Sequence, residues 1–351
     1  MCAGMWTCKA FIKSCKMIEG HGDDIRGYAR PIVSNFSSNV FYAANQSGLA
    51  EHLYQAVASV RNYPEPAPLT LEQELANHHN VLPHNVCATN GATEAIYLIA
   101  QAFRGSRTAI LEPTFSEYED ACKVHEHRIT YAFLLDEIPP DAALVWICNP
   151  NNPTGQVIDH NVLSQFIQTR PQSCFVIDQS YERFTAKRLF EADEATALPN
   201  LILLHSMTKH YAIPGLRLGY LTASEKLADK IKYYRMPWPI NQLTLKAGLY
   251  LLKNNAQSDP DINYFREECQ WLKQQLVALG IEVSPTDTNF MLCRLRLETA
   301  SRLKAWLANT HGYLIRDASN FKGLDERYFR IAAQTHAENV HFVEYIRQWL
   351  R

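Results

Sequence analysis

The chain lacks the features that would assign it to a membrane or to a nucleic acid. Its longest apolar runs are far too short to cross a bilayer, so we predict no transmembrane segment. Basic and acidic residues nearly balance, with 34 Lys and Arg against 36 Asp and Glu, which indicates neither a nucleic-acid-binding surface nor a polybasic membrane patch. The first sixteen residues have no signal-peptide pattern, and we assign them no function. These absences together predict a cytoplasmic protein.

Paired cysteine motifs are absent as well. The nine cysteines are scattered and none belongs to a CxxC pair. This spacing favours reduced thiols over a disulfide framework or a zinc site, so we predict no metal. What the chain does have is an ordinary globular composition, 47% apolar and 20% charged. Its 351 residues are enough for one large core or two unequal domains.

Between about residues 85 and 220, short apolar runs alternate with amphipathic ones. The runs at 107–111, 143–148, 174–177 and 201–204 are typical of buried strands, and those at 93–103 and 159–168 of helices. This alternation predicts an α/β fold with a large, doubly wound, mostly parallel sheet, whose ligands bind beyond the carboxyl ends of its strands. After residue 239 the order of helices and strands predicts a smaller α+β domain.

These patterns set the expected domain organisation. We place the large domain at 46–245 and the small domain at 246–351. We expect residues 1–45 to form an N-terminal arm that packs on the small domain or on a partner subunit.

Two ionisable side chains follow predicted strands. Lys209 comes after the run at 201–204, and burial beside Arg217 would lower its pKa, which an amine requires to attack an aldehyde. Asp178 ends the run at 174–177, where a carboxylate can keep a pyridine nitrogen protonated and make the ring an electron sink. Taken singly, each residue has a simpler interpretation, as a solvated surface lysine or a helix-capping aspartate.

Residues suited to a phosphate lie near the same strand ends. The segment at 91–93 stands where a strand gives way to a helix, so free amides can point at an anion. Such a turn is more often only a helix N-cap. The hydroxyls of Ser206 and Thr208 and the guanidinium of Arg217 could complete a phosphate site.

Taken together, the segments at 149–155, 178–181 and 206–220 resemble the core of the class I/II aminotransferase family, which are pyridoxal-phosphate enzymes of fold type I. The resemblance covers roughly residues 20–350. It implies that Lys209 carries pyridoxal 5'-phosphate, that Asp178 pairs with the ring nitrogen and that Tyr181 contacts the ring hydroxyl, these three being the catalytic residues. The other implied cofactor contacts are Asn152 at the ring hydroxyl, Phe115 stacked on the ring, and Gly91, Ala92, Thr93, Ser206, Thr208 and Arg217 at the phosphate. Tyr63 is similar to the tyrosine that reaches the cofactor phosphate of the neighbouring subunit, which implies a homodimer with shared active sites.

Within that family, the segments at 208–220, 236–241 and 323–330 resemble the threonine-phosphate decarboxylases of cobalamin biosynthesis. This narrower resemblance implies decarboxylation of L-threonine O-3-phosphate to (R)-1-amino-2-propanol O-phosphate and carbon dioxide. The implied contacts to this phosphorylated amino acid are His21, Asn39, Arg316 and Arg330.

Two alternatives stay open at this point. The sister group, the histidinol-phosphate aminotransferases, has the same cofactor residues, so a transamination of that type is the alternative function. Arg316 has a simpler interpretation as a surface residue paired with Asp317. One departure from the decarboxylase pattern leaves the pocket shape open, because Phe41 and Tyr42 replace the usual proline and small residues after the asparagine.

Overall fold

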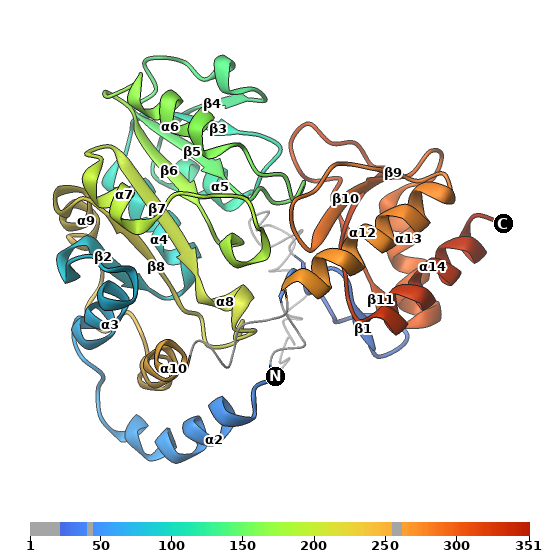
Figure 1. The fold of residues 1–351 in the computed structure, drawn as a ribbon, viewed down its shortest axis with the longest axis horizontal. Helices are drawn as coiled ribbons and strands as arrows, with labels where there is room; N and C mark the ends of the chain where they lie inside the picture. The colour runs from blue at the N-terminus through green and yellow to red at the C-terminus, as the bar shows by residue number, and fades with distance from the viewer. Residues whose placement is uncertain (1–21, 41–44, 255–261) are drawn as a thin grey trace, which may run out of the picture.

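The computed structural model describes residues 22–40, 45–254 and 262–351, and these residues are built around two main sheets that lie side by side (Figure 1). The larger sheet has seven strands in the order β2-β8-β7-β6-β5-β3-β4. These strands are β2 (Val86–Thr89), β3 (Arg107–Leu111), β4 (Arg128–Ala132), β5 (Leu144–Cys148), β6 (Cys174–Asp178), β7 (Leu201–Ser206) and β8 (Gly219–Ala223). Neighbouring strands from β7 to β4 are parallel, whereas β8 is antiparallel to both β2 and β7. The predicted large, mostly parallel sheet is therefore confirmed.

Alternate side chains of the central strands enter two different cores, one on each face of this sheet. Trp146 and Val176 pack on one face, and Val145 and Phe175 pack on the other. The covering helices are α4 (Gly91–Ala102), α5 (Glu117–Val124) and α9 (Glu225–Lys232) on the first face, and α6 (His160–Gln168) and α7 (Ala192–Ala197) on the second. Because both faces are covered, the central strands β5, β6 and β7 are largely apolar, which is the pattern that identified them in the sequence.

Further helices pack beside the β2–β8 edge of the large sheet (Figure 1). They are α2 (Ser47–Ala56), α3 (Leu69–His79), α8 (Met207–His210) and α10 (Gln242–Lys253). Leu71 and Tyr220 share one core with Leu245 and Leu251 of α10. The domain division predicted between residues 245 and 246 falls inside α10, and it stays a prediction.

The smaller sheet has the strand order β12-β13-β10-β9 and is antiparallel. Its strands are β9 (Glu282–Val283), β10 (Phe290–Arg294), β12 (Arg316–Asp317) and β13 (Tyr328–Ala332), and its helices are α12 (Ile262–Ala278), α13 (Ala300–Trp306) and α14 (His336–Trp349). A short strand, β1 (Ser34–Asn35), pairs in parallel with β11 (Tyr313–Leu314). Phe36 stacks on Phe342 with ring centroids 4.6 Å apart, so this part of the predicted arm packs on the small sheet's core. Residues 1–21 and 41–44 of that arm lie outside the described residues.

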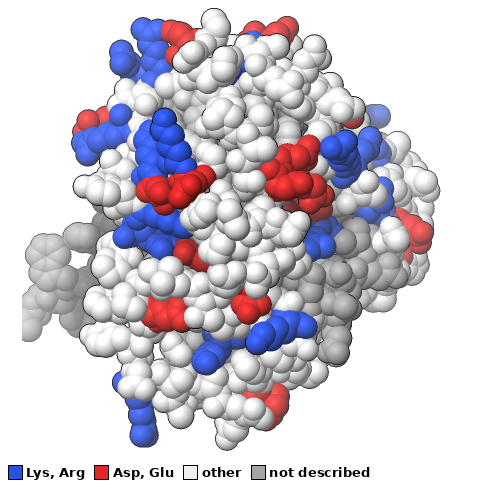
Figure 2. All heavy atoms as spheres, turned by 60° about the vertical axis from the view of Figure 1, so that its left-hand side comes forward, with Lys and Arg blue, Asp and Glu red and all other residues white. Residues whose placement is uncertain are grey.

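The described surface mixes charges of both signs. Figure 2 shows Lys and Arg beside Asp and Glu on the face it presents, with wide uncharged areas between them. Among the helices that the structure describes, none is long and apolar enough to cross a membrane. Within the same residues, no group of three or more His, Cys, Asp or Glu side chains is placed to hold a metal ion.

Candidate active site

A cavity of about 250 Å³ lies where the carboxyl ends of β5, β6 and β7 meet the small sheet. Thirteen of the residues predicted from the sequence line it: Asn39, Ala92, Thr93, Phe115, Asn152, Asp178, Tyr181, Ser206, Thr208, Lys209, Arg217, Arg316 and Arg330. These residues come from eight separate stretches of the chain. The structure therefore brings together most of the predicted site.

Lys209 lies on α8, directly after β7, with its side chain at the cavity wall. Burial, followed by the positive charges of Arg330 and Arg217, lowers the pKa of Lys209 from its ordinary value of 10.5 to about 8. An amine with this pKa is partly neutral near neutral pH, which allows it to attack a carbonyl carbon.

Asp178 is the last residue of β6, and both of its carboxylate oxygens are hydrogen-bonded. The backbone N–H of Ser180 donates to Oδ1 over 2.8 Å, and the hydroxyl of Tyr118 donates to Oδ2 over 2.6 Å. Tyr118 is fully buried and stacks on Trp146 with an interplanar angle of 11°. Burial raises the pKa of Tyr118 well above its usual value, so its hydroxyl stays a donor. These contacts hold the carboxylate in one orientation at the cavity wall.

Tyr118 was missed by the sequence analysis. Its signal was modest, because the chain offers only an aromatic residue three positions after Phe115 on a helix next to a predicted strand. Its partner Asp178 is 60 residues away in the chain, so the contact depends on the sheet order.

The predicted phosphate residues gather around the start of α4. Gly91 has a φ of +78°, and a Cβ placed there would lie 2.7 Å from Nη2 of Arg217. Ala92 and Thr93 follow it on α4, and both line the cavity. A free helix start beside a guanidinium is an arrangement that binds anions. Gly91 itself contacts Arg217 and is not among the lining residues.

Arg316 and Arg330 lie opposite each other on the paired strands β12 and β13. Arg330 donates to Oδ1 of Asn152 and to the backbone carbonyl of Ser37. Arg316 donates to the backbone carbonyl of Asp317 and, over 2.7 Å, to Oδ1 of Asn320. Burial and then the charge of Arg330 lower the pKa of Arg316 to about 10. Arg316 is only 7% exposed, so the interpretation of it as a surface residue is wrong.

Three further predicted contacts, Asn39, Tyr63 and His21, have different positions. Asn39 is 1% exposed, lies beside Tyr181, and within the described part of the chain neither of its side-chain amide atoms has a hydrogen-bond partner of normal geometry. Tyr63 is 83% exposed and packs against Trp238, with ring centroids 5.2 Å apart, outside the cavity. His21 lies outside the described residues.

Comparison with known proteins identifies the family. The sequence model of aminotransferase class I and II matches residues 31–346. The chain belongs to this family. It is 30% identical to the threonine-phosphate decarboxylase of Salmonella typhimurium, over 94% of this chain and 96% of that protein. It is 28% identical to a histidinol-phosphate aminotransferase of Caldanaerobacter subterraneus, over 93% of this chain and 98% of that protein.

Solved structures agree with this assignment. The crystal structure of L-threonine-O-3-phosphate decarboxylase from Porphyromonas gingivalis superposes with a TM-score of 0.89 at 36% identity, covering 91% of this chain and 99% of that one. The fold is that of the pyridoxal-phosphate enzymes of fold type I, as predicted. The protein is thus an enzyme of the aminotransferase-like family that depends on pyridoxal 5'-phosphate.

The cavity suits this cofactor. The lysine with a lowered pKa suits the aldehyde of the cofactor, and the carboxylate held by two donors suits its ring nitrogen. The anion site at the start of α4 suits its phosphate. Lys209, Asp178 and Arg217 all line the same cavity, so a single ligand can reach the three groups.

Proposed function

We propose that this enzyme decarboxylates L-threonine O-3-phosphate, releasing carbon dioxide and (R)-1-amino-2-propanol O-phosphate for cobalamin biosynthesis. The observation that carries the proposal is the pair Arg316 and Arg330, two buried cations held side by side by uncharged oxygens. Buried charges are stable when they are paired, so these arginines favour a ligand with more than one anionic group. Threonine phosphate meets this requirement with a carboxylate and a phosphate in one molecule. Histidinol phosphate has a phosphate alone, although 2-oxoglutarate, the acceptor in the alternative reaction, also has two anionic groups. The likeness to two threonine-phosphate decarboxylases supports the same choice.

The cofactor roles that we propose follow from the positions of the side chains in the cavity. Lys209 carries the cofactor, Asp178 keeps its ring nitrogen protonated, and Asn152 and Tyr181 bind the ring hydroxyl. Phe115 covers the ring face, and the phosphate is held by Gly91, Ala92, Thr93, Ser206, Thr208 and Arg217. When bound, pyridoxal phosphate supplies an electron sink for the charge that develops at the substrate Cα.

The substrate contacts then decide which bond at Cα breaks. Arg316 and Arg330 hold the two anionic groups of the substrate, and the buried amide of Asn39 is a third contact. Holding both anions fixes how Cα faces Lys209. Because the pKa of Lys209 is about 8, its amine can hold a proton and donate it to Cα in place of the carbon dioxide that has left. His21 remains a proposed substrate contact.

The direct test compares two substrates on the cofactor-loaded enzyme. One tube holds threonine O-phosphate and is assayed for carbon dioxide; the other holds histidinol phosphate and 2-oxoglutarate and is assayed for glutamate. Carbon dioxide without glutamate is the expected result. Glutamate without carbon dioxide would mean that the enzyme is an aminotransferase of the histidinol-phosphate type and that the arginines serve the phosphate of histidinol phosphate and the carboxylates of 2-oxoglutarate in turn.

Variants of the two arginines test the substrate site separately. Removing one partner of a buried charged pair costs roughly 2–5 kcal/mol, or about thirty- to several-thousand-fold in affinity. We expect Arg316→Ala and Arg330→Ala to raise the KM for threonine phosphate within this range while the cofactor stays bound. Arg294→Ala, which alters an arginine that pairs with Glu282 and Asp325 outside the cavity, is the control and should leave KM unchanged. An unchanged KM in either cavity variant rejects that residue's role.

We also propose that Tyr63 acts in the active site of a partner subunit, because its exposed ring lies outside the cavity of its own chain. Lys209→Ala and Tyr63→Ala subunits, each weakly active alone, should recover activity when refolded together, since the mixed dimer has one site with both residues intact. No recovery would mean that Tyr63 does not act across a dimer.

A further inference from the structure

A buried ion pair lies behind the two segments that hold the proposed cofactor. Nδ1 of His205 lies 3.0 Å from Oε2 of Glu182, and the other ring nitrogen lies 3.1 Å from Oγ1 of Thr222 on β8. Glu182 directly follows Tyr181, and His205 directly precedes Ser206. The side chain of His205 is 2% exposed and that of Glu182 is 25% exposed.

The pair faces away from the cavity. Successive side chains of a strand point to opposite faces of the sheet, so His205 points away from the side to which Ser206 points. Tyr181 and Ser206 line the catalytic cavity, but neither Glu182 nor His205 does. Glu182 instead lines a small separate hollow of about 20 Å³, which Ser206 and Met207 also line. The ion pair therefore connects the segment after β6 to the end of β7 on the side that faces away from the catalytic cavity.

The surroundings fix the pair in place. Burial alone would raise the pKa of Glu182, but the attraction of His205 outweighs it and lowers that pKa to about 2. His205 stacks on Tyr220 with ring centroids 4.6 Å apart and an interplanar angle of 14°. Burial, followed by repulsion from His205, lowers the pKa of the neighbouring His79 to about 3, so His79 is neutral and hydrogen-bonds Tyr220 over 2.7 Å. An ionised carboxylate packed in this way holds its partner more rigidly than a solvated one.

We infer that Glu182 and His205 are positioning residues that hold the Asp178–Tyr181 segment in register with the segment from Ser206 to Lys209, and so set the affinity for the cofactor. This inference rests on the cofactor roles proposed above for Tyr181 and Ser206. Neither residue touches the cavity, so both act through their neighbours in the chain.

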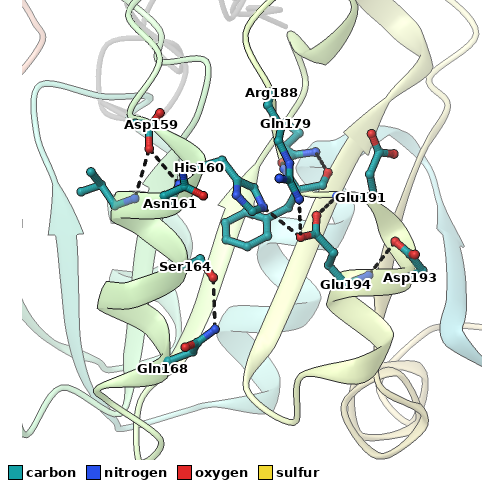
Figure 3. Close-up of polar contacts among 12 residues, drawn as sticks. Asp159, His160, Asn161, Ser164, Gln168, Gln179, Arg188, Glu191, Asp193 and Glu194 are labelled. Carbon is teal, nitrogen blue, oxygen red and sulfur yellow. Dashed lines mark hydrogen bonds and ion pairs between the residues drawn. The ribbon is translucent and has the colours of Figure 1, made fainter.

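The fold offers a matched control in a second pair of the same type. Nε2 of His160 lies 2.9 Å from Oε1 of Glu194, with the two side chains 7% and 28% exposed (Figure 3). This pair joins α6 to α7, and Glu194 also contacts Arg188, as Figure 3 shows. Neither His160 nor Glu194 lines the cavity. Glu182→Gln and Glu194→Gln thus remove the same charge from the same kind of contact at similar burial.

The experiment measures cofactor affinity and stability on the full chain. The apoenzyme of each variant is titrated with pyridoxal phosphate by absorbance, and its urea unfolding is followed without cofactor. We expect similar losses of apoenzyme stability in both variants, but a dissociation constant for the cofactor that is roughly tenfold higher in Glu182→Gln alone, a typical size for coupling between contacting residues. Equal cofactor affinity in the two variants overturns the inference, because the pair would then be only structural.

Two further variants separate the possible failures. If Glu182→Gln does not fold, Thr222→Val removes a contact from the other ring nitrogen of His205 and should also weaken cofactor binding, whereas unchanged binding rejects the inference. Ser206→Ala tests the premise that Ser206 contacts the cofactor. If it leaves cofactor affinity unchanged, the proposed role of Ser206 is wrong, and the inference fails with it whatever the reaction catalysed.

Discussion

The pKa of Lys209 gives the most discriminating prediction about the site. Arg330→Gln removes a positive charge that lowers the pKa of Lys209, whereas Arg316→Gln removes a neighbouring charge that is not among the main causes of this lowering. Without the charge of Arg330 the protonated amine is less unfavourable, so the pKa of Lys209 rises. At a fixed pH below that value, less of the amine is neutral and the apoenzyme captures its cofactor more slowly.

The size of the effect follows from the two limiting pKa values of Lys209. With a pKa of about 8, about one quarter of the amines are neutral at about pH 7.5, compared with about one in a thousand at the ordinary value of 10.5. The site therefore increases the reactive fraction by about 240-fold at that pH. Burial is the larger cause, so Arg330→Gln should forfeit only part of this gain.

The assay follows the visible absorbance of the cofactor as it binds to the apoenzyme at a series of pH values from about 6 to 10. In the unaltered enzyme the rate should rise with pH and level off above about 8, because the neutral amine is lost as the pH falls through the pKa. The midpoint should move to higher pH in Arg330→Gln and stay in place in Arg316→Gln. An unmoved midpoint in Arg330→Gln, or equal shifts in the two variants, would refute the reasoning.

Two further predictions concern residues next to the cofactor site. Gly91→Ala adds a Cβ that meets Arg217 and adopts a positive φ, whereas Gly105→Ala has a similar φ of +73° and nothing within 4 Å. Both should lose about 1 kcal/mol of unfolding free energy in urea, but only Gly91→Ala should raise the cofactor's dissociation constant, and equal affinities would contradict this. Tyr118→Phe removes the hydrogen bond to Asp178 and should cost about 1.5–3 kcal/mol in the same unfolding measurement, with a shifted absorbance maximum of bound cofactor. A loss below about 0.5 kcal/mol with an unshifted maximum would show that the bond does not hold the carboxylate.

The larger sheet was predictable because its strands are apolar on both faces and short, and the helices between them are amphipathic. In a parallel sheet the residues that follow the strands converge, so Asp178 and Lys209 could be placed together from the sequence. Both line the cavity. The role of each stays a proposal, since position in a cavity does not by itself establish chemistry.

Contacts between distant segments were not predictable in the same way. The hydrogen bond from Arg330 to Asn152 joins residues 178 apart, and the one from Arg330 to Ser37 joins residues 293 apart. No local pattern indicates such partners, because they depend on how the small sheet and the arm dock against the large sheet. The ion pair of Glu182 and His205 was not predictable for a related reason, since the two residues are 23 positions apart in the chain and no local pattern pairs them.

Arg330 shows why the cofactor could be inferred more firmly than the substrate. Its guanidinium touches Asn152 from the large sheet and Ser37 from the arm, while its strand pairs with that of Arg316. Most of the proposed cofactor residues lie on or next to the larger sheet, whereas the proposed substrate contacts that the structure describes, Asn39, Arg316 and Arg330, come from the arm, β12 and β13. We expect a small change in how these segments meet to turn a different bond at Cα toward cleavage. We therefore expect the choice between decarboxylation and transamination to depend on how the arm and the small sheet pack around Arg330, and the two-substrate assay shows which choice this enzyme makes.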